Sequence, residues 1–158
     1  MKSSDYILGY IISLLPIVFL QNVLFFFVAI LFGLKIKLSI LLTILVAMIV
    51  SVFFISLGIL IGSLVSEKGS GGIGSVIVQL VCFTSGMYFP RDMIGDFFSK
   101  ICEILPFESI LNIVKGVLNS DYQMISIRNI VVFTLYLVVV LLLSIKVFQK
   151  KMVSDNKS

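Results

Sequence analysis

Few residues of this sequence could do chemistry, and their types exclude most catalytic mechanisms. The chain has no histidine and two cysteines, Cys82 and Cys102, which do not stand at CxxC spacing. Cys/His metal sites need clustered ligands, and histidine is the commonest general acid or base. We therefore predict no catalytic residue, no metal site and no cofactor bound by this chain. We interpret the two cysteines as packed thiols, and a disulfide between them is the alternative.

Acidic side chains are absent from the interiors of the long apolar segments. Proton-coupled transport needs a carboxylate inside the membrane, so a proton-coupled small multidrug transporter is a weaker alternative here. An intramembrane serine enzyme would lack its histidine base. No GxxxxGK[ST] phosphate loop occurs in the sequence, so ATP hydrolysis, if this chain depends on it, belongs to another polypeptide.

The composition is that of a membrane protein. Of 158 residues, 59% are hydrophobic and 13% are charged, with a mean hydropathy of +1.20. Ordinary globular domains carry roughly 25% charged residues. The net charge of +4 comes without a basic stripe, so nucleic acid is not an expected partner. The sequence predicts an all-α protein in a lipid bilayer.

Four segments are long enough, or nearly so, to span a bilayer, which takes about 20 apolar residues. They are about 6–34, 40–65, 73–89 and 127–147, within one transmembrane domain covering 1–158. Pro16 divides the first, so the part before it is predicted to be an interfacial elbow ending in a bend or kink. Four crossings put both termini on one side. The basic tail KVFQKKM predicts that this side is the cytoplasm, although lysines and arginines are equally numerous on the two sides.

The stretch SGMYFPRDMIGDFFSKICEILPFESI, residues 85–110, interrupts this pattern. Ser85, Gly86 and Pro90 predict a helix break, and Pro106 separates two successive amphipathic periods. Each period covers about a dozen residues, or roughly 18 Å of helix, whereas the hydrocarbon core is about 30 Å thick. We predict an external helical hairpin over about 91–119, interfacial or re-entrant. An ordinary surface loop with helical turns is the alternative.

Small and polar residues within the spans have two interpretations each. Gly58, Gly62 and Ser66 share one helix face, which predicts either contact with another helix or permease, or packing within the chain. Gln21 and Asn22 predict either a polar substrate path or interhelical hydrogen bonds. The glycine-rich run 69–74 is interpreted as a hinge or loop leading into the third span.

The order of these features resembles the membrane subunit of type-2 ATP-binding-cassette (ABC) exporters. The stretches that carry the resemblance are FTSGMYFPRDM and ILPFESILNIVKGVL, with LGILIGSLVS similar to the glycine-bearing helix that precedes them in the family. In that family an outward helix ends in a Ser-Gly-x-x-x-Pro break, and two short external helices around a Leu-Pro precede the last span. The family usually has six spans, so the resemblance implies that this chain corresponds to the C-terminal four.

The resemblance implies a transport subunit, or part of one, in a bacterial plasma or inner membrane. Its expected partners are an ABC ATPase, which uses the ATP, and a second permease copy or complementary half. The expected ATPase-facing residues are Ser3, Ser4, Asp5, Glu67 and Lys68. The cargo would be a drug, a peptide, a lipid-linked compound or a glycan. The alternative is a non-transporting immunity or scaffold protein derived from a truncated permease.

Overall fold

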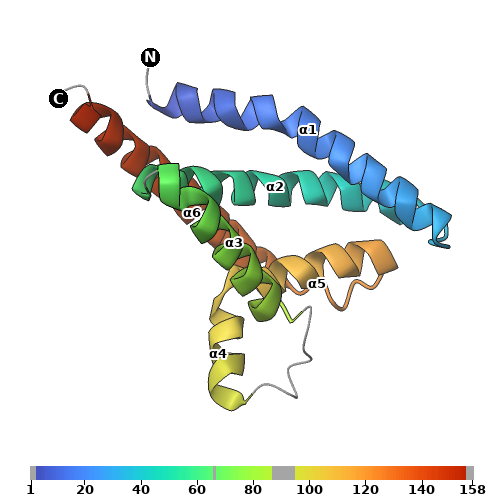
Figure 1. Ribbon diagram of the computed structural model, residues 1–158. Helices are drawn as coiled ribbons and strands as arrows, with labels where there is room; N and C mark the ends of the chain where they lie inside the picture. The colour runs from blue at the N-terminus through green and yellow to red at the C-terminus, as the bar shows by residue number, and fades with distance from the viewer. Residues whose placement is uncertain (1–2, 66, 87–94, 156–158) are drawn as a thin grey trace. The chain divides into compact units, whose positions relative to one another are not determined.

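The computed structural model of the chain describes residues 3–65, 67–86 and 95–155, and every regular element in these ranges is a helix. The all-α prediction is therefore confirmed for the described residues. The helices are α1 (Ser3–Leu31), α2 (Leu38–Leu64), α3 (Glu67–Thr84), α4 (Asp96–Ile104), α5 (Pro106–Asn119) and α6 (Ile127–Asp155) (Figure 1).

Three of these helices are long and apolar enough to cross a membrane. Their qualifying parts are Asp5–Leu31, Leu38–Leu64 and Ile127–Lys150. The first two, with 27 residues each, are about 40 Å long at 1.5 Å per residue. The apolar part of α3 is shorter, Gly71–Thr84. The described helix stops before the predicted end at residue 89, and residues 87–89 lie outside the described ranges. A third crossing over 73–89 stays a prediction.

Helix α1 continues through Pro16 without interruption, so the part before this proline belongs to the same helix, and an interfacial elbow with a bend or kink at Pro16 stays a prediction. Proline removes one helical hydrogen bond, but membrane helices tolerate this loss where neighbouring groups compensate. The helix ends in a Schellman motif: Gly33 N–H donates to the Ile30 carbonyl at 3.0 Å, and Leu34 N–H to Ala29 at 3.0 Å. Gly33 has φ +102°, the left-handed conformation that this motif requires.

Helix α3 begins earlier than predicted. The run 69–74 lies inside the helix, which begins at Glu67, so the prediction of a glycine hinge or loop was wrong. Each helical glycine costs about 1 kcal/mol relative to alanine.

The helices form two compact units, and the first contains residues 1–64 and 139–158. Here α1 and α2 run antiparallel and contact each other (Figure 1). Its buried side chains include Ile7, Ile11, Phe26 and Phe53, together with the small polar residues Thr43, Ser56 and Ser144. The Thr43 hydroxyl donates to the Ser39 carbonyl and that of Ser56 to Val52, each at 2.7 Å. Bonds of this kind satisfy a buried hydroxyl within its own helix.

The second unit contains residues 65–138. Its core includes Cys102 on α4, Ile110 and Ile113 on α5, and Phe133 on α6. Helices α4 and α5 have 9 and 14 residues, which at 1.5 Å each makes them about 14 and 21 Å long. Neither can cross a hydrocarbon core of about 30 Å, so the described part of the predicted hairpin has the expected dimensions. Residues 91–94 of that hairpin lie outside the described ranges.

Candidate functional site

The predicted break at Ser85 and Gly86 is present, because α3 ends at Thr84. Gly86 has φ +74°, and its N–H donates to the Phe83 carbonyl at 3.4 Å. A left-handed residue directly after a helix is the usual way to end it, and glycine adopts this conformation without strain. Thr84 and Ser85 are buried, and their hydroxyls donate to Leu80 and Cys82 carbonyls at 2.7 and 3.1 Å. Pro90, the third residue of the predicted break, lies outside the described residues.

The predicted boundary between two helices at Pro106 is also present. Leu105 is extended, with φ −74° and ψ 146°, and Pro106 opens α5 at its first helical position. A proline restricts the preceding residue to extended conformations and itself fits the first turn of a helix. The Leu105 N–H still donates to the Ile101 carbonyl at 3.2 Å, so the turn between the two helices is tight.

A small polar pocket lies between the end of α3 and residues within α4 and α5 in the second unit. Its volume is about 130 Å³, and its lining is Thr84, Ser85, Gly86, Ser99, Cys102, Glu108, Leu111, Asn112 and Lys115. Three polar residues of α5 reach it because the spacing 108, 112, 115 repeats with the helical period. Ligand pockets usually measure roughly 300–1,000 Å³, so this pocket suits a few waters better than a cargo molecule. The pocket therefore joins the end of α3, before the helix break, to the two hairpin helices α4 and α5 that follow it.

The inward face of α5 carries several small residues. Its buried residues are Pro106, Ser109, Ile110, Ile113 and Gly116. Small residues in this line let the following turn approach closely. A Cβ on Gly116 would lie 2.6 Å from Cγ1 of Ile125 and 3.0 Å from the Asp121 carbonyl oxygen.

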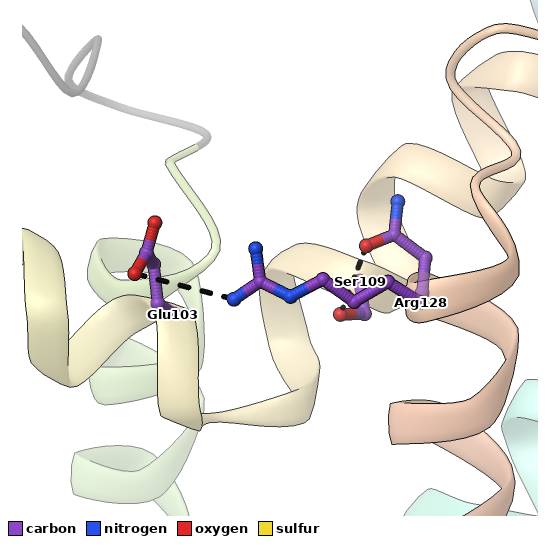
Figure 2. Close-up of polar contacts among 4 residues, drawn as sticks. Glu103, Ser109 and Arg128 are labelled. Atoms are coloured by element: carbon purple, nitrogen blue, oxygen red, sulfur yellow. Dashed lines mark hydrogen bonds and ion pairs between the residues drawn. The ribbon is translucent and has the colours of Figure 1, made fainter.

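Polar contacts hold α5 against the start of α6. The Ser109 hydroxyl donates to Oδ1 of Asn129 at 3.3 Å, and Nδ2 of Asn129 donates to the Met124 carbonyl at 3.1 Å. Figure 2 shows the hydrogen bond from Ser109. It also shows an ion pair between Arg128 on α6 and Glu103 on α4, whose nitrogen and oxygen are 4.0 Å apart. The two side chains of the ion pair are 66% and 39% exposed, so water screens their attraction.

A second hollow lies within the first unit and contains two residues of the predicted small-residue face. It measures about 630 Å³ and is lined by Tyr6, Ile7, Tyr10, Leu14, Ile55, Gly58, Ile59, Gly62, Ser63 and Phe148. A Cβ on either glycine would meet nothing within 4 Å, so these glycines border open space. Ser66, the third residue of that face, lies outside the described residues. We call this hollow the tyrosine–glycine groove.

The remaining predicted residues lie on separate surfaces. Asn22 is half-buried, and its amide donates to the Val18 carbonyl of the same helix at 3.0 Å; its neighbour Gln21 is exposed. A polar path through these two residues stays a prediction. Asp5 is exposed in the first turn of α1. Ser3, Ser4, Glu67 and Lys68 have helical backbone at the starts of α1 and α3, and their side chains are outside the described residues.

The described residues provide no metal centre. They contain no group of three or more Cys, Asp or Glu side chains suited to hold a metal ion. Cys82 is half-buried and Cys102 buried, and they do not form a disulfide. The interpretation as two packed thiols is thereby confirmed over the disulfide.

Sequence reasoning missed the contacts that join the helices. The glycine in KGVLNSDY was a usable signal, because a glycine inside an amphipathic helix often marks a close packing contact. Ser99 and Asn112 in the polar pocket carried no such signal. Neither did the bond between Ser109 and Asn129, which are 20 residues apart.

These observations define the class: an all-α membrane protein with a short helical hairpin ahead of its last long helix. Residues 1–119 match the family model described as ABC-2 type transporter, which covers well over half of the chain. The chain belongs to this family of permease-type membrane transporters. The matched region ends where α5 ends. No curated protein and no solved structure matches the chain.

Proposed function

We propose that the chain is a permease subunit, or part of one, of an ATP-driven exporter. The observation that carries this proposal is the family match over 1–119, which takes in α1 to α5 and so the helix break and the hairpin. The sequence lacks a phosphate-binding loop, so the ATP is hydrolysed by a separate ABC ATPase. A second permease copy or complementary half completes the path. The cargo is a drug, a peptide, a lipid-linked compound or a glycan.

We expect the acidic residues at the predicted ATPase-facing segments to contribute to docking of the partner. Asp5 is exposed at the start of α1, and Glu67 is the first residue of α3. Charged residues at the edge of an interface mainly set the association rate and reject wrong partners. Reversing their charge therefore weakens association without altering the spans.

Co-purification tests this function. The tagged chain is co-expressed with an ABC ATPase encoded beside it, purified in mild detergent, returned to lipid vesicles and assayed for ATP hydrolysis. We expect the ATPase to co-elute and its hydrolysis to depend on the chain. The double variant Asp5→Arg, Glu67→Arg should lose most of the co-eluting ATPase. A control charge reversal in the exposed turn after α5, Asp121→Arg, should keep it.

One outcome of this experiment would contradict the proposed exporter function. If the correctly inserted chain neither retains the ATPase nor changes its hydrolysis, the exporter function is wrong. A non-transporting scaffold or immunity protein then becomes the better explanation of the same fold.

A further inference from the structure

Helix α4 turns two isoleucines away from the unit to which it belongs. Ile101 is 37% exposed and Ile104 is 67% exposed. Ser99 and Cys102 line the polar pocket instead, and Cys102 is buried. At about 100° per residue, the line through 99 and 102 and the line through 101 and 104 point to opposite sides of the helix. We call Ile101 and Ile104 the isoleucine edge.

A charged edge runs beside the isoleucine edge on the same outer surface of α4. Lys100 is exposed, and the side chain of Glu103 is 39% exposed. Immersion of α4 in hydrocarbon would place both charges in lipid, which is costly. Full exposure to water would leave the isoleucine edge without apolar contact. Only the boundary between water and hydrocarbon suits both edges at once.

The ion pair between α4 and α6 places this surface at that boundary. Arg128, which contacts Glu103 (Figure 2), follows the first residue of Ile127–Lys150, the part of α6 able to span a membrane. Its 24 residues are about 36 Å long at 1.5 Å each. The hydrocarbon core is about 30 Å thick, so the first turn of the span lies at the level of the headgroups. The end of α4 is therefore held at the same depth.

We propose that α4 lies in the membrane interface, with its isoleucine edge embedded among the acyl chains next to the headgroups, in the leaflet where α6 begins. Lipid is the partner because the ion pair brings Glu103, the neighbour of Ile104, to Arg128, the neighbour of Ile127. Ile127 is 80% exposed at the start of the span, so the isoleucine edge continues the lipid-facing surface of α6. This inference selects the interfacial over the re-entrant arrangement and does not depend on the proposed transport function.

Depth-dependent quenching of tryptophan fluorescence tests the proposal. The chain contains no tryptophan, so Ile104→Trp in the full chain supplies a single reporter on the isoleucine edge. The variant is placed in phosphatidylcholine vesicles whose acyl chains carry bromine either near the glycerol end or near the methyl end. We expect the larger loss of fluorescence with bromine near the glycerol end. Ile101→Trp, a second reporter on the same edge, should give the same order.

Two matched variants calibrate the depth. Lys100→Trp lies in the same turn of α4 but on the charged edge, so iodide present on both sides of the vesicles should quench it more than either brominated lipid does. Val138→Trp lies near the middle of the span on α6 and is 48% exposed, so bromine near the methyl end should quench it most. Circular dichroism checks that each variant keeps the helix content of the unaltered chain.

Three results would overturn the proposal. If bromine near the methyl end quenches Ile104→Trp most, α4 enters the hydrocarbon and the hairpin is re-entrant. If iodide quenches Ile104→Trp as strongly as Lys100→Trp, and neither lipid does, α4 lies in water. If lipid and iodide both quench it weakly, protein covers the isoleucine edge, and a second copy of the chain is then the occupant to examine by cross-linking.

Discussion

Two glycines of the hairpin unit meet demands that a residue with a side chain satisfies poorly. Gly86 ends α3 with φ +74°, a conformation that costs L-residues roughly 1–2 kcal/mol. Gly116 lies on the buried face of α5, where the next turn of the chain approaches closely. The first demand concerns backbone conformation and the second concerns space, so different substitutions test them.

Changing Gly86 to leucine should lower the free energy of unfolding by about 1–2 kcal/mol, because leucine resists the left-handed conformation. Gly86→Asn should cost less, since asparagine tolerates this conformation at helix ends. Thermal unfolding in mild detergent measures both. Gly72→Leu, inside α3 and open to space, is the control and should not destabilise. Equal stability of the leucine and asparagine variants would contradict the assigned backbone geometry. If a transport assay becomes possible, we expect Gly86→Leu to reduce export more than assembly.

Changing Gly116 to alanine should destabilise the chain by about 1–3 kcal/mol, as overpacking does in a close-packed site. The added methyl would lie 2.6 Å from Ile125 and 3.0 Å from a backbone oxygen, and the backbone cannot rotate away. The shift in unfolding temperature measures the effect. Gly71→Ala, an exposed position inside α3 with nothing within 4 Å, should not destabilise. A variant at 116 as stable as the one at 71 would refute the close approach.

At the scale of elements, the start of α6 is held by one part-buried hydrogen bond to α5 and one exposed ion pair to α4. Ser109 is buried and bonded to Asn129, which also binds the Met124 carbonyl. The ion pair of Arg128 and Glu103 is exposed and at the limit of its distance (Figure 2). Burial decides which contact contributes more to the free energy of unfolding, because a buried polar group left without a partner costs more than a screened ion pair gains.

Ser109→Ala and Asn129→Ala should each cost about 1 kcal/mol or more, and the double change should cost less than their sum because they share one bond. Arg128→Gln should change stability by less than about 1 kcal/mol. A double-mutant cycle in chemical or thermal unfolding measures these values. If the effects of the two alanine changes add exactly, the hydrogen bond between Ser109 and Asn129 does not contribute to stability.

At the scale of the whole molecule, the number of crossings decides which side of the membrane the hairpin faces. Helices α1, α2 and α6 are long enough to span, whereas the apolar part of α3 is shorter. The predicted four crossings place the link after α1 and the hairpin on the same side, outside the cell. Three crossings would place them on opposite sides.

Cysteine labelling from one side of the membrane distinguishes these arrangements. Single cysteines at two exposed positions, Lys35→Cys and Tyr122→Cys, are introduced after the native cysteines are changed to serine. With four crossings, we expect an impermeant maleimide to label both from outside the cell. A cysteine in place of Lys150, in the basic tail, should react only after permeabilisation. Labelling of position 35 but not 122 from outside would mean that α3 does not cross.

Local features of the sequence determined most of the helical architecture. Segments of more than 20 apolar residues predicted the three long helices, and Gly86 and Pro106 predicted a helix end and a helix start. These are properties of short stretches, since periodicity and restricted backbone angles act within a few residues. The start of α3 was mispredicted, because the glycine run 69–74 is helical despite the low helix preference of glycine.

Only the tertiary structure decided which side chains meet across helices. An apolar stripe permits several docking angles and registers with nearly equal burial, so sequence alone did not reveal that Gly116 faces Ile125 or that Ser109 reaches Asn129. It also left open whether Gly58 and Gly62 would be packed or would border a groove. The chain's class and its helices follow from the sequence because they depend on short-range backbone preference and on apolar length. The polar pocket and the groove depend on contacts between distant segments, which only the packed chain defines.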